Sequence, residues 1–126
     1  MYFIDRTKPR FQKIMNNFYR LPEFEKELKK LSKRYPSLPS DIEDIKPILL
    51  VNPTGIGKNF TIVSIQDDVK IIKVRIHCES LRSRAVRLIY AFHENKIEFM
   101  YFEMYFKGDK TSEDKERILN YLQNFK

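Results

Sequence analysis

The sequence predicts an α+β domain with two helices near its amino end, a sheet of about four strands after them, and one last helix. Three observations predict this class. Apolar residues recur at helical spacing in 22–35, later segments alternate with the period of a strand, and the last segment returns to helical spacing. The chain has 126 residues, 42% hydrophobic and 13% aromatic, which is enough to close one modest core. We therefore expect one domain over 1–126, with 1–12 as an N-terminal extension.

Residues 13–21 are aromatic and end before Pro22, which favours a short strand that leads into a helix. The helix is predicted to begin at Pro22, because proline fits the first helical position, and to end before Pro36. Its apolar face is expected to consist of Phe24, Leu28, Leu31 and Tyr35.

A second helix is predicted to begin at Ser40, where the sequence SDIE matches a capping box. Pro47 is expected to kink or interrupt it. The glycines and lysine of 51–60 suggest a phosphate loop, but that motif needs a glycine in place of Asn52 and a hydroxyl in place of Asn59. We expect instead a turn-rich loop that enters a strand at 60–65. The apolar side of the second helix would be formed by Ile42, Ile45 and Leu49.

The next predicted strand covers 69–77, where apolar and polar residues alternate. Its apolar side would consist of Ile72, Val74 and Ile76. Its polar side would present Lys73, Arg75 and His77.

Residues 85–92 and 97–106 flank a predicted hairpin. We expect a three-residue loop, 94–96, in which Asn95 takes a left-handed conformation, so that Arg87 pairs with Glu103. A two-residue loop would reverse the faces. Arg87 on the face of Phe102 would show that this register is wrong, and we expect the proposed site to be lost with it. Arg87 would share its face with Tyr101, Tyr105 and Lys107. The core side would hold Val86, Leu88, Tyr90, Phe92, Met100, Phe102, Met104 and Phe106.

A terminal helix is predicted over 115–125, preceded by Ser112. Its buried residues are expected to be Ile118, Leu119 and Leu122.

The charge of the chain favours an anionic partner. The formal net charge is +7, and 70–90 contains six cations but only one acid. No apolar run approaches the roughly 20 residues of a membrane span, so we expect a cytoplasmic protein with no membrane partner. The two histidines and the lone Cys78 have no metal-site spacing, so no metal is expected.

The polar face of the predicted sheet carries side chains suited to binding phosphodiesters. Arginine offers paired donors to phosphate, lysine a point charge, and an exposed tyrosine a surface on which a base stacks. RNA cleavage at its own 2′-hydroxyl needs a base, an acid and cations. The candidate catalytic residues are Lys73, Arg75, Arg87, Glu103, Tyr105 and Lys107, and the candidate RNA-binding residues are Lys70, Arg82, Arg84 and Lys110. A cationic strand face is more often a plain binding surface, so the residues alone leave both interpretations open.

Four segments in their order resemble the RelE/ParE superfamily of type II toxin-antitoxin toxins. They are FEKELKKLSKRYPSLPSDIEDI, IIKVRI, VRLIYAF and EMYFKGDKTSED. The likeness depends on a Lys-rich helix with a Tyr-Pro end, a K-x-R strand, R-[LV]-I-Y and Y-x-K-x-D-K, and it covers about 13–125. The resemblance implies two helices packed on a twisted, mainly antiparallel sheet, the RelE-like fold.

In the RelE branch, the resemblance implies a metal-independent endoribonuclease that acts on ribosome-bound messenger RNA and needs no cofactor. Lys73 or Glu103 would be the base, and Lys107 or Tyr105 the acid. Arg75 and Arg87 would clamp the phosphate. Some members place a catalytic aromatic or histidine after the last strand, where this chain has Gly108, Asp109 and Lys110.

The expected protein partner is a cognate antitoxin with an acidic segment that folds on binding. Two alternatives remain open. The chain resembles the ParE branch equally in fold, which would make it a non-enzymatic toxin that inhibits DNA gyrase by protein binding. An inactive binding protein of the RelE fold is the other alternative. The sequence does not predict an oligomeric state.

Overall fold

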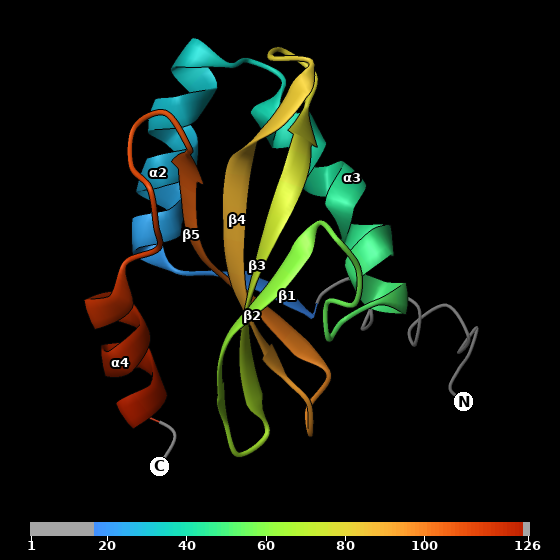
Figure 1. The fold of residues 1–126 in the computed structure, drawn as a ribbon, viewed down its shortest axis with the longest axis vertical. Helices are drawn as coiled ribbons and strands as arrows, with labels where there is room; N and C mark the ends of the chain where they lie inside the picture. Colours follow the sequence, from blue (N-terminus) through green and yellow to red (C-terminus); the bar gives the residue numbers. More distant parts are fainter. Residues whose placement is uncertain (1–16, 125–126) are drawn as a thin grey trace, which may run out of the picture.

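Five strands form one mixed sheet in the computed structural model, which describes residues 17–124. The strand order is β1-β5-β4-β3-β2, in which β1 runs parallel to β5 and the other neighbours are antiparallel (Figure 1). In chain order the elements are β1 (Phe18–Arg20), α2 (Pro22–Arg34), α3 (Leu38–Val51), β2 (Phe60–Gln66), β3 (Val69–Cys78), β4 (Ser83–His93), β5 (Glu98–Phe106) and α4 (Lys115–Gln123).

The predicted α+β class is confirmed, and the count of about four strands is corrected to five. The additional strand is β1, which lies within the predicted strand 13–21 and pairs its three residues with 99–101 of β5. The proposed extension 1–12 lies outside the described residues, as do 13–16. No helix within 17–124 combines the length and the apolar character needed to cross a membrane.

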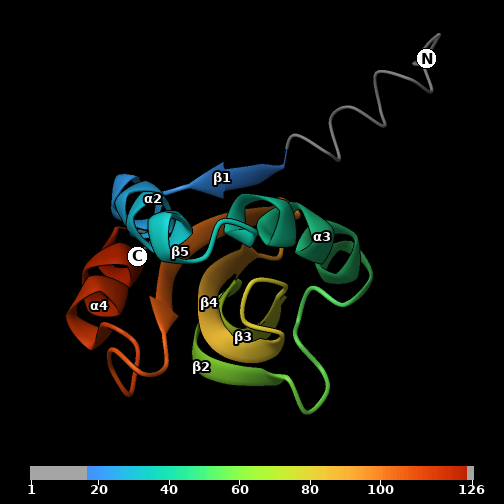
Figure 2. The same cartoon turned by 90° about the horizontal axis from the view of Figure 1, so that it is seen from above.

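The helices α2 and α3 cover one face of the sheet, while α4 lies against the other face beside β5 (Figure 2). The predicted helix from Pro22 is confirmed as α2, with Phe24, Leu28 and Leu31 buried. The predicted start of α3 at Ser40 is wrong, because the helix begins at Leu38. Pro47 does not interrupt α3, which continues to Val51.

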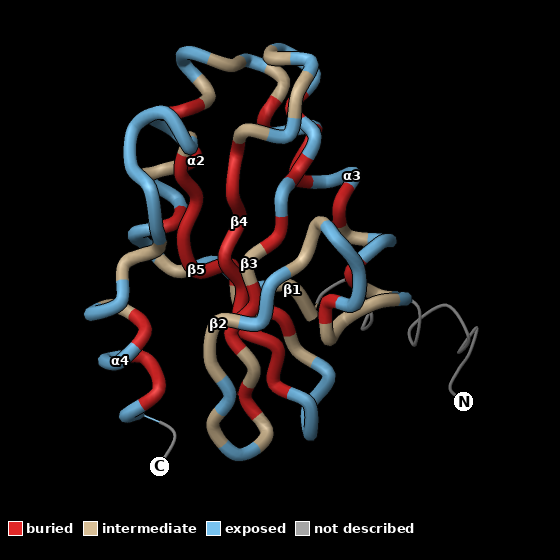
Figure 3. The backbone as a smooth tube through the Cα atoms, in the orientation of Figure 1, coloured by how far each residue is buried: buried red, intermediate tan, exposed pale blue. Residues whose placement is uncertain are grey.

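Two apolar clusters hold these layers together, and buried residues concentrate in β4 and β5 (Figure 3). The cluster under α2 and α3 contains the predicted Ile72, Val74 and Ile76 of β3. The cluster under α4 contains Ile71 and Ile89 of the sheet, together with Ile118, Tyr121 and Leu122 of the helix. Leu119 was expected inside but is 60% exposed, since the face of α4 that meets the sheet passes through Tyr121 instead.

The predicted register of the β4–β5 hairpin is wrong. His93 pairs with Glu98, so the loop has four residues, 94–97, and the left-handed conformation falls on Ile97 rather than on Asn95. A bulge then places Phe102 as an extra residue between Glu103, which pairs with Ile89, and Tyr101. Arg87 consequently pairs with Tyr105 and not with Glu103.

The longer loop and the bulge each shift the register by one residue. Each shift alone would turn the side chains of β5 to the opposite face of the sheet, so together they restore the predicted faces beyond the bulge. Between the loop and the bulge, Tyr101 points into the cluster under α2 and α3, and Met100 packs against the cluster under α4. Phe102 also joins the α4 cluster, so Arg87 does lie on the face of Phe102. The expected loss of the site does not follow, because Lys107 stays on the face of Arg87. Beyond the bulge the predicted sides hold, with Met104 and Phe106 on the core side and Tyr105 and Lys107 on the opposite one.

Candidate functional site

A polar pocket opens on the α4 side of the sheet, beside the part of that face that α4 covers. Its volume is about 200 Å³. The four cations predicted to share this face, Lys73, Arg75, Arg87 and Lys107, all line it. The remaining lining residues are Asn59, Thr61, Tyr105 and Thr111. No carboxylate lines the pocket in the part of the chain that the structure describes.

Strand pairing places these side chains in one row. Arg75 of β3 pairs with Arg87 of β4, which pairs on its other side with Tyr105 of β5. Lys107 follows β5 directly, and its backbone N–H donates to the carbonyl of Ala85 at 2.8 Å. Thr61 of β2 pairs with Lys73 of β3, so four paired strands contribute to the pocket and hold its walls more firmly than loops would.

Arg75 and Arg87 place two like charges opposite each other, an arrangement that destabilises a strand pair. Arg87 is only 8% exposed, and burial, followed by repulsion from Arg75, lowers the pKa of its guanidinium. One donor of Arg87 is used by the carbonyl of Arg84, with the Nη1···O distance at 2.5 Å. Within 17–124, Arg75, Arg87 and Lys107 form no salt bridge, so an anion in the pocket would relieve their repulsion.

Lys73 differs from the other three cations because it has an internal counter-ion. Its Nζ lies 3.0 Å from Oε1 of Glu113, whose side chain is 10% exposed. Burial alone would raise the pKa of Glu113, but hydrogen bonding and attraction from Lys73 outweigh it and lower the pKa overall.

Tyr105 forms a buried wall of the pocket. Burial raises the pKa of its hydroxyl, and the nearby charges of Glu113 and Glu103 raise it further, while Arg87 lowers it. The phenol therefore keeps its proton at neutral pH and is available as a donor. Lys110 lies over the ring, with its Nζ 5.2 Å from the ring centroid.

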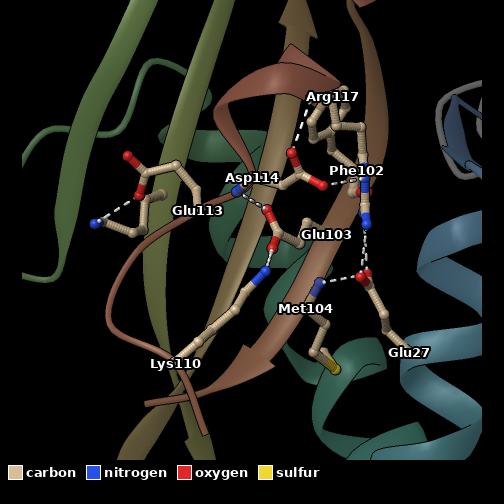
Figure 4. Close-up of polar contacts among 9 residues, drawn as sticks. Glu27, Phe102, Glu103, Met104, Lys110, Glu113, Asp114 and Arg117 are labelled. Atoms are coloured by element: carbon tan, nitrogen blue, oxygen red, sulfur yellow. Dashed lines mark hydrogen bonds and ion pairs between the residues drawn. The ribbon is translucent and has the colours of Figure 1, made fainter.

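Glu103 does not line the pocket. Its side chain is fully buried, and Oε1 accepts the backbone N–H of Asp114 at 2.8 Å. Figure 4 shows the Glu103 carboxylate between Asp114 and Lys110, and Lys110 forms an ion pair with it. This geometry gives no support to Glu103 as the base, because its carboxylate binds Lys110 and Asp114 of the connection from β5 to α4.

The four residues predicted to bind RNA also lie outside the pocket wall. Lys70 is at the far end of β3, 3.5 Å from Glu94, and Arg82 is exposed in the turn between β3 and β4. Arg84 is exposed and donates to the carbonyl of Arg75 at 3.4 Å. Lys110 pairs with Glu103.

Sequence reasoning missed Asn59, Thr61, Thr111 and Glu113. Thr61 pairs with Lys73 across β2 and β3, and the alternation of the predicted strand 60–65 could have placed it on this face. Glu113 contacts Lys73 across 40 positions of sequence, and no local pattern marks such a contact.

The described residues contain no group of three or more His, Cys, Asp or Glu side chains that could hold a metal ion. No protein-family model matches the chain, and a search of curated proteins finds none that is similar.

Proposed function

We propose that the chain is a toxin of the RelE type, a metal-independent endoribonuclease that cuts messenger RNA on the ribosome in the cytoplasm. One observation carries the proposal. Arg75, Arg87 and Lys107 converge on one pocket with Tyr105, and none of these cations has a salt-bridge partner within 17–124. The resemblance of the K-x-R, R-L-I-Y and Y-x-K segments to the RelE branch supports the same function.

The proposed reaction uses the 2′-hydroxyl of the RNA itself. The 2′-oxygen attacks the adjacent phosphorus while its proton passes to a base. The bond from phosphorus to the 5′-oxygen breaks, and that oxygen takes a proton from an acid. The products are a 2′,3′-cyclic phosphate and a 5′-hydroxyl. Negative charge develops on the phosphate oxygens, so cations fixed around them accelerate the step.

The pocket residues divide among these roles. Arg75 and Arg87 clamp the phosphate, because guanidinium groups donate in pairs to its oxygens. Tyr105 is the first candidate for the acid, since its hydroxyl stays protonated at neutral pH. Lys107 is the second candidate. Lys73 is the candidate base among the lining residues, and its Nζ lies 3.0 Å from the Glu113 carboxylate.

Primer extension on programmed ribosomes tests this function. The wild-type chain should produce discrete cuts, and their 5′-hydroxyl ends should accept a labelled phosphate from polynucleotide kinase without prior phosphatase treatment. Arg87→Met and Lys107→Met should each lower the cleavage rate by roughly 10²-fold, because they remove donors to developing charge. Lys26→Met is the control, since Lys26 is an exposed cation of α2 outside the pocket, and it should leave the cleavage rate unchanged.

Two results would overturn the proposal. Cuts with 5′-phosphate ends would mean that the 2′-hydroxyl is not the nucleophile. Growth arrest without cuts, together with gyrase-linked DNA breaks, would assign the chain to the ParE alternative.

The proposed protein partner is an acidic antitoxin, whose carboxylates would compensate the net charge of +7. Co-expression with the product of the neighbouring reading frame tests this. An acidic neighbour should co-purify with the chain and relieve its growth defect. A neighbour that does neither removes the antitoxin from the proposal.

A further inference from the structure

Glu113 brings one negative charge to the edge of the cationic pocket. It lies in the connection from β5 to α4, one residue before Asp114, which caps the start of α4 (Figure 4). Its carboxylate is 3.0 Å from Nζ of Lys73, and Lys73 lines the pocket with Arg75, Arg87 and Lys107. The charge is permanent at neutral pH, because the ion pair with Lys73 lowers the pKa of Glu113.

The effect of this carboxylate depends on the charge of what enters the pocket. An internal phosphodiester of RNA carries one negative charge, whereas a terminal phosphate carries nearly two above its second pKa of about 6. The Coulomb energy between Glu113 and a ligand is proportional to the ligand's charge. Glu113 therefore repels a terminal phosphate about twice as strongly, in free energy, as it repels an internal phosphodiester at the same position.

We propose that Glu113 tunes specificity in this pocket, by reducing the advantage that a doubly charged terminal phosphate has over the singly charged phosphodiester of a continuous RNA strand. The inference rests on the proposed function, because it takes the pocket as the phosphate site. It names the residue that makes internal linkages more competitive with terminal phosphates. It also gives a role to Glu113, which within 17–124 is the one carboxylate that forms a salt bridge with a pocket cation.

A conservative substitution tests the charge of Glu113 with little change of shape. The side chains of Lys73 and Glu113 are 24% and 10% exposed, so the replacement must still accept a hydrogen bond from Lys73. Glu113→Gln keeps the shape of the side chain and an oxygen that can accept from Lys73. It removes only the charge.

Two small ligands, titrated into the 15.3 kDa chain and followed by backbone amide NMR, measure the bias directly. Uridylyl-uridine carries one phosphodiester and no terminal phosphate. Uridine 3′-monophosphate carries a terminal phosphate that is doubly charged at pH 8. We expect Glu113→Gln to tighten binding of uridylyl-uridine about 3-fold and that of the monophosphate about 10-fold, because the second gain is the square of the first.

Two variants control for the fold and for general charge. Glu113→Asp keeps the carboxylate and should keep the wild-type ratio of the two affinities. Glu116→Gln removes the same charge from an exposed position of α4, and it should change both affinities less than Glu113→Gln does.

The outcomes separate this inference from the proposed function. If both ligands shift the amides of Arg87 and Lys107 but Glu113→Gln leaves the ratio of their affinities unchanged, the specificity role of Glu113 is wrong and the phosphate site stands. An equal gain for both ligands has the same meaning. If neither ligand perturbs the pocket in the wild-type chain, both the site and the inference fall.

Discussion

The two faces of the sheet use the same strands for different purposes, and neighbouring residues of β4 show the difference. Leu88 is fully buried and packs in the cluster under α2 and α3. Arg87 points to the other face, into the cationic pocket. The first face is covered along its length by two helices, whereas α4 covers only part of the second.

The contrast shows how a domain of this size tolerates two opposed guanidinium groups. Apolar burial under α2 and α3, supplemented by the α4 cluster, provides most of the favourable free energy of folding. The open part of the second face is then free to hold Arg75 and Arg87, whose repulsion weakens the strand pair. The predictions below test this division, from the largest expected effect to the smallest.

Leu88→Ala should cause the largest loss of stability. Truncation of a fully buried leucine leaves a cavity in the main cluster, and we expect the free energy of unfolding to fall by about 2–5 kcal/mol. Urea denaturation followed by circular dichroism measures it. A loss below about 1 kcal/mol would show that this face is not the main source of stability.

Arg117→Met should loosen α4 by an intermediate amount. Arg117 donates twice to Glu27 of α2, at 2.8 and 3.2 Å, and once to the carbonyl of Phe102 at 2.9 Å. Loss of these charged hydrogen bonds should lower the free energy of unfolding by roughly 1.5–3 kcal/mol. Amide exchange in α4 should accelerate more than exchange in α3.

The matched control for Arg117→Met is Lys115→Met, which removes an exposed cation from the same helix. Its expected effect is within about 0.5 kcal/mol. Equal losses from the two variants would mean that net charge, rather than the contact with Glu27, holds α4 in place.

The hairpin shows how much of the fold the sequence could predict. Alternation in β3 correctly predicted which residues face the core, because a strand has a period of two wherever it is regular. The bulge at Phe102 has neither glycine nor proline to mark it, so the sequence could not reveal it. The pocket cations were still predicted on one face, because the bulge and the longer loop cancel each other.

The site was predictable as far as it depends on strand alternation. Lys73, Arg75, Arg87 and Lys107 were found in this way, and Thr61 could have been. The roles of acidic residues could not be predicted, since they depend on contacts between distant segments. The Glu103 carboxylate accepts the backbone N–H of Asp114 in the connection before α4, and Glu113 is the ion-pair partner of Lys73.

The burial of His93 should make stability depend on pH by a modest amount. Burial, more than any nearby charge, lowers the pKa of His93 below its ordinary value of about 6.5. Above that value the imidazole is neutral in both states. As the pH falls below it, the unfolded chain takes up a proton that the folded chain resists, so stability falls until the folded pKa is passed.

The change from this single group cannot exceed about 1.4 kcal/mol per pH unit. Urea midpoints at pH 7.5, 6.5 and 5.5 should therefore decline faster for the wild-type chain than for His93→Gln. Parallel declines would contradict the assignment to His93, because the exposed His77 and the carboxylates remain in both proteins.

Arg87→Met should have the smallest effect on stability, although it lies next to Leu88. The variant loses the hydrogen bond to the carbonyl of Arg84, which water can replace because Arg84 is exposed. It also removes a charge that burial and Arg75 both disfavour in the folded chain. These terms oppose each other, so we expect the free energy of unfolding to change by no more than about 0.5 kcal/mol. The same urea titration that is applied to Leu88→Ala measures it. A loss as large as that of Leu88→Ala would mean that Arg87 supports the fold, and the loss of RNA cleavage in Arg87→Met would then say nothing about phosphate binding.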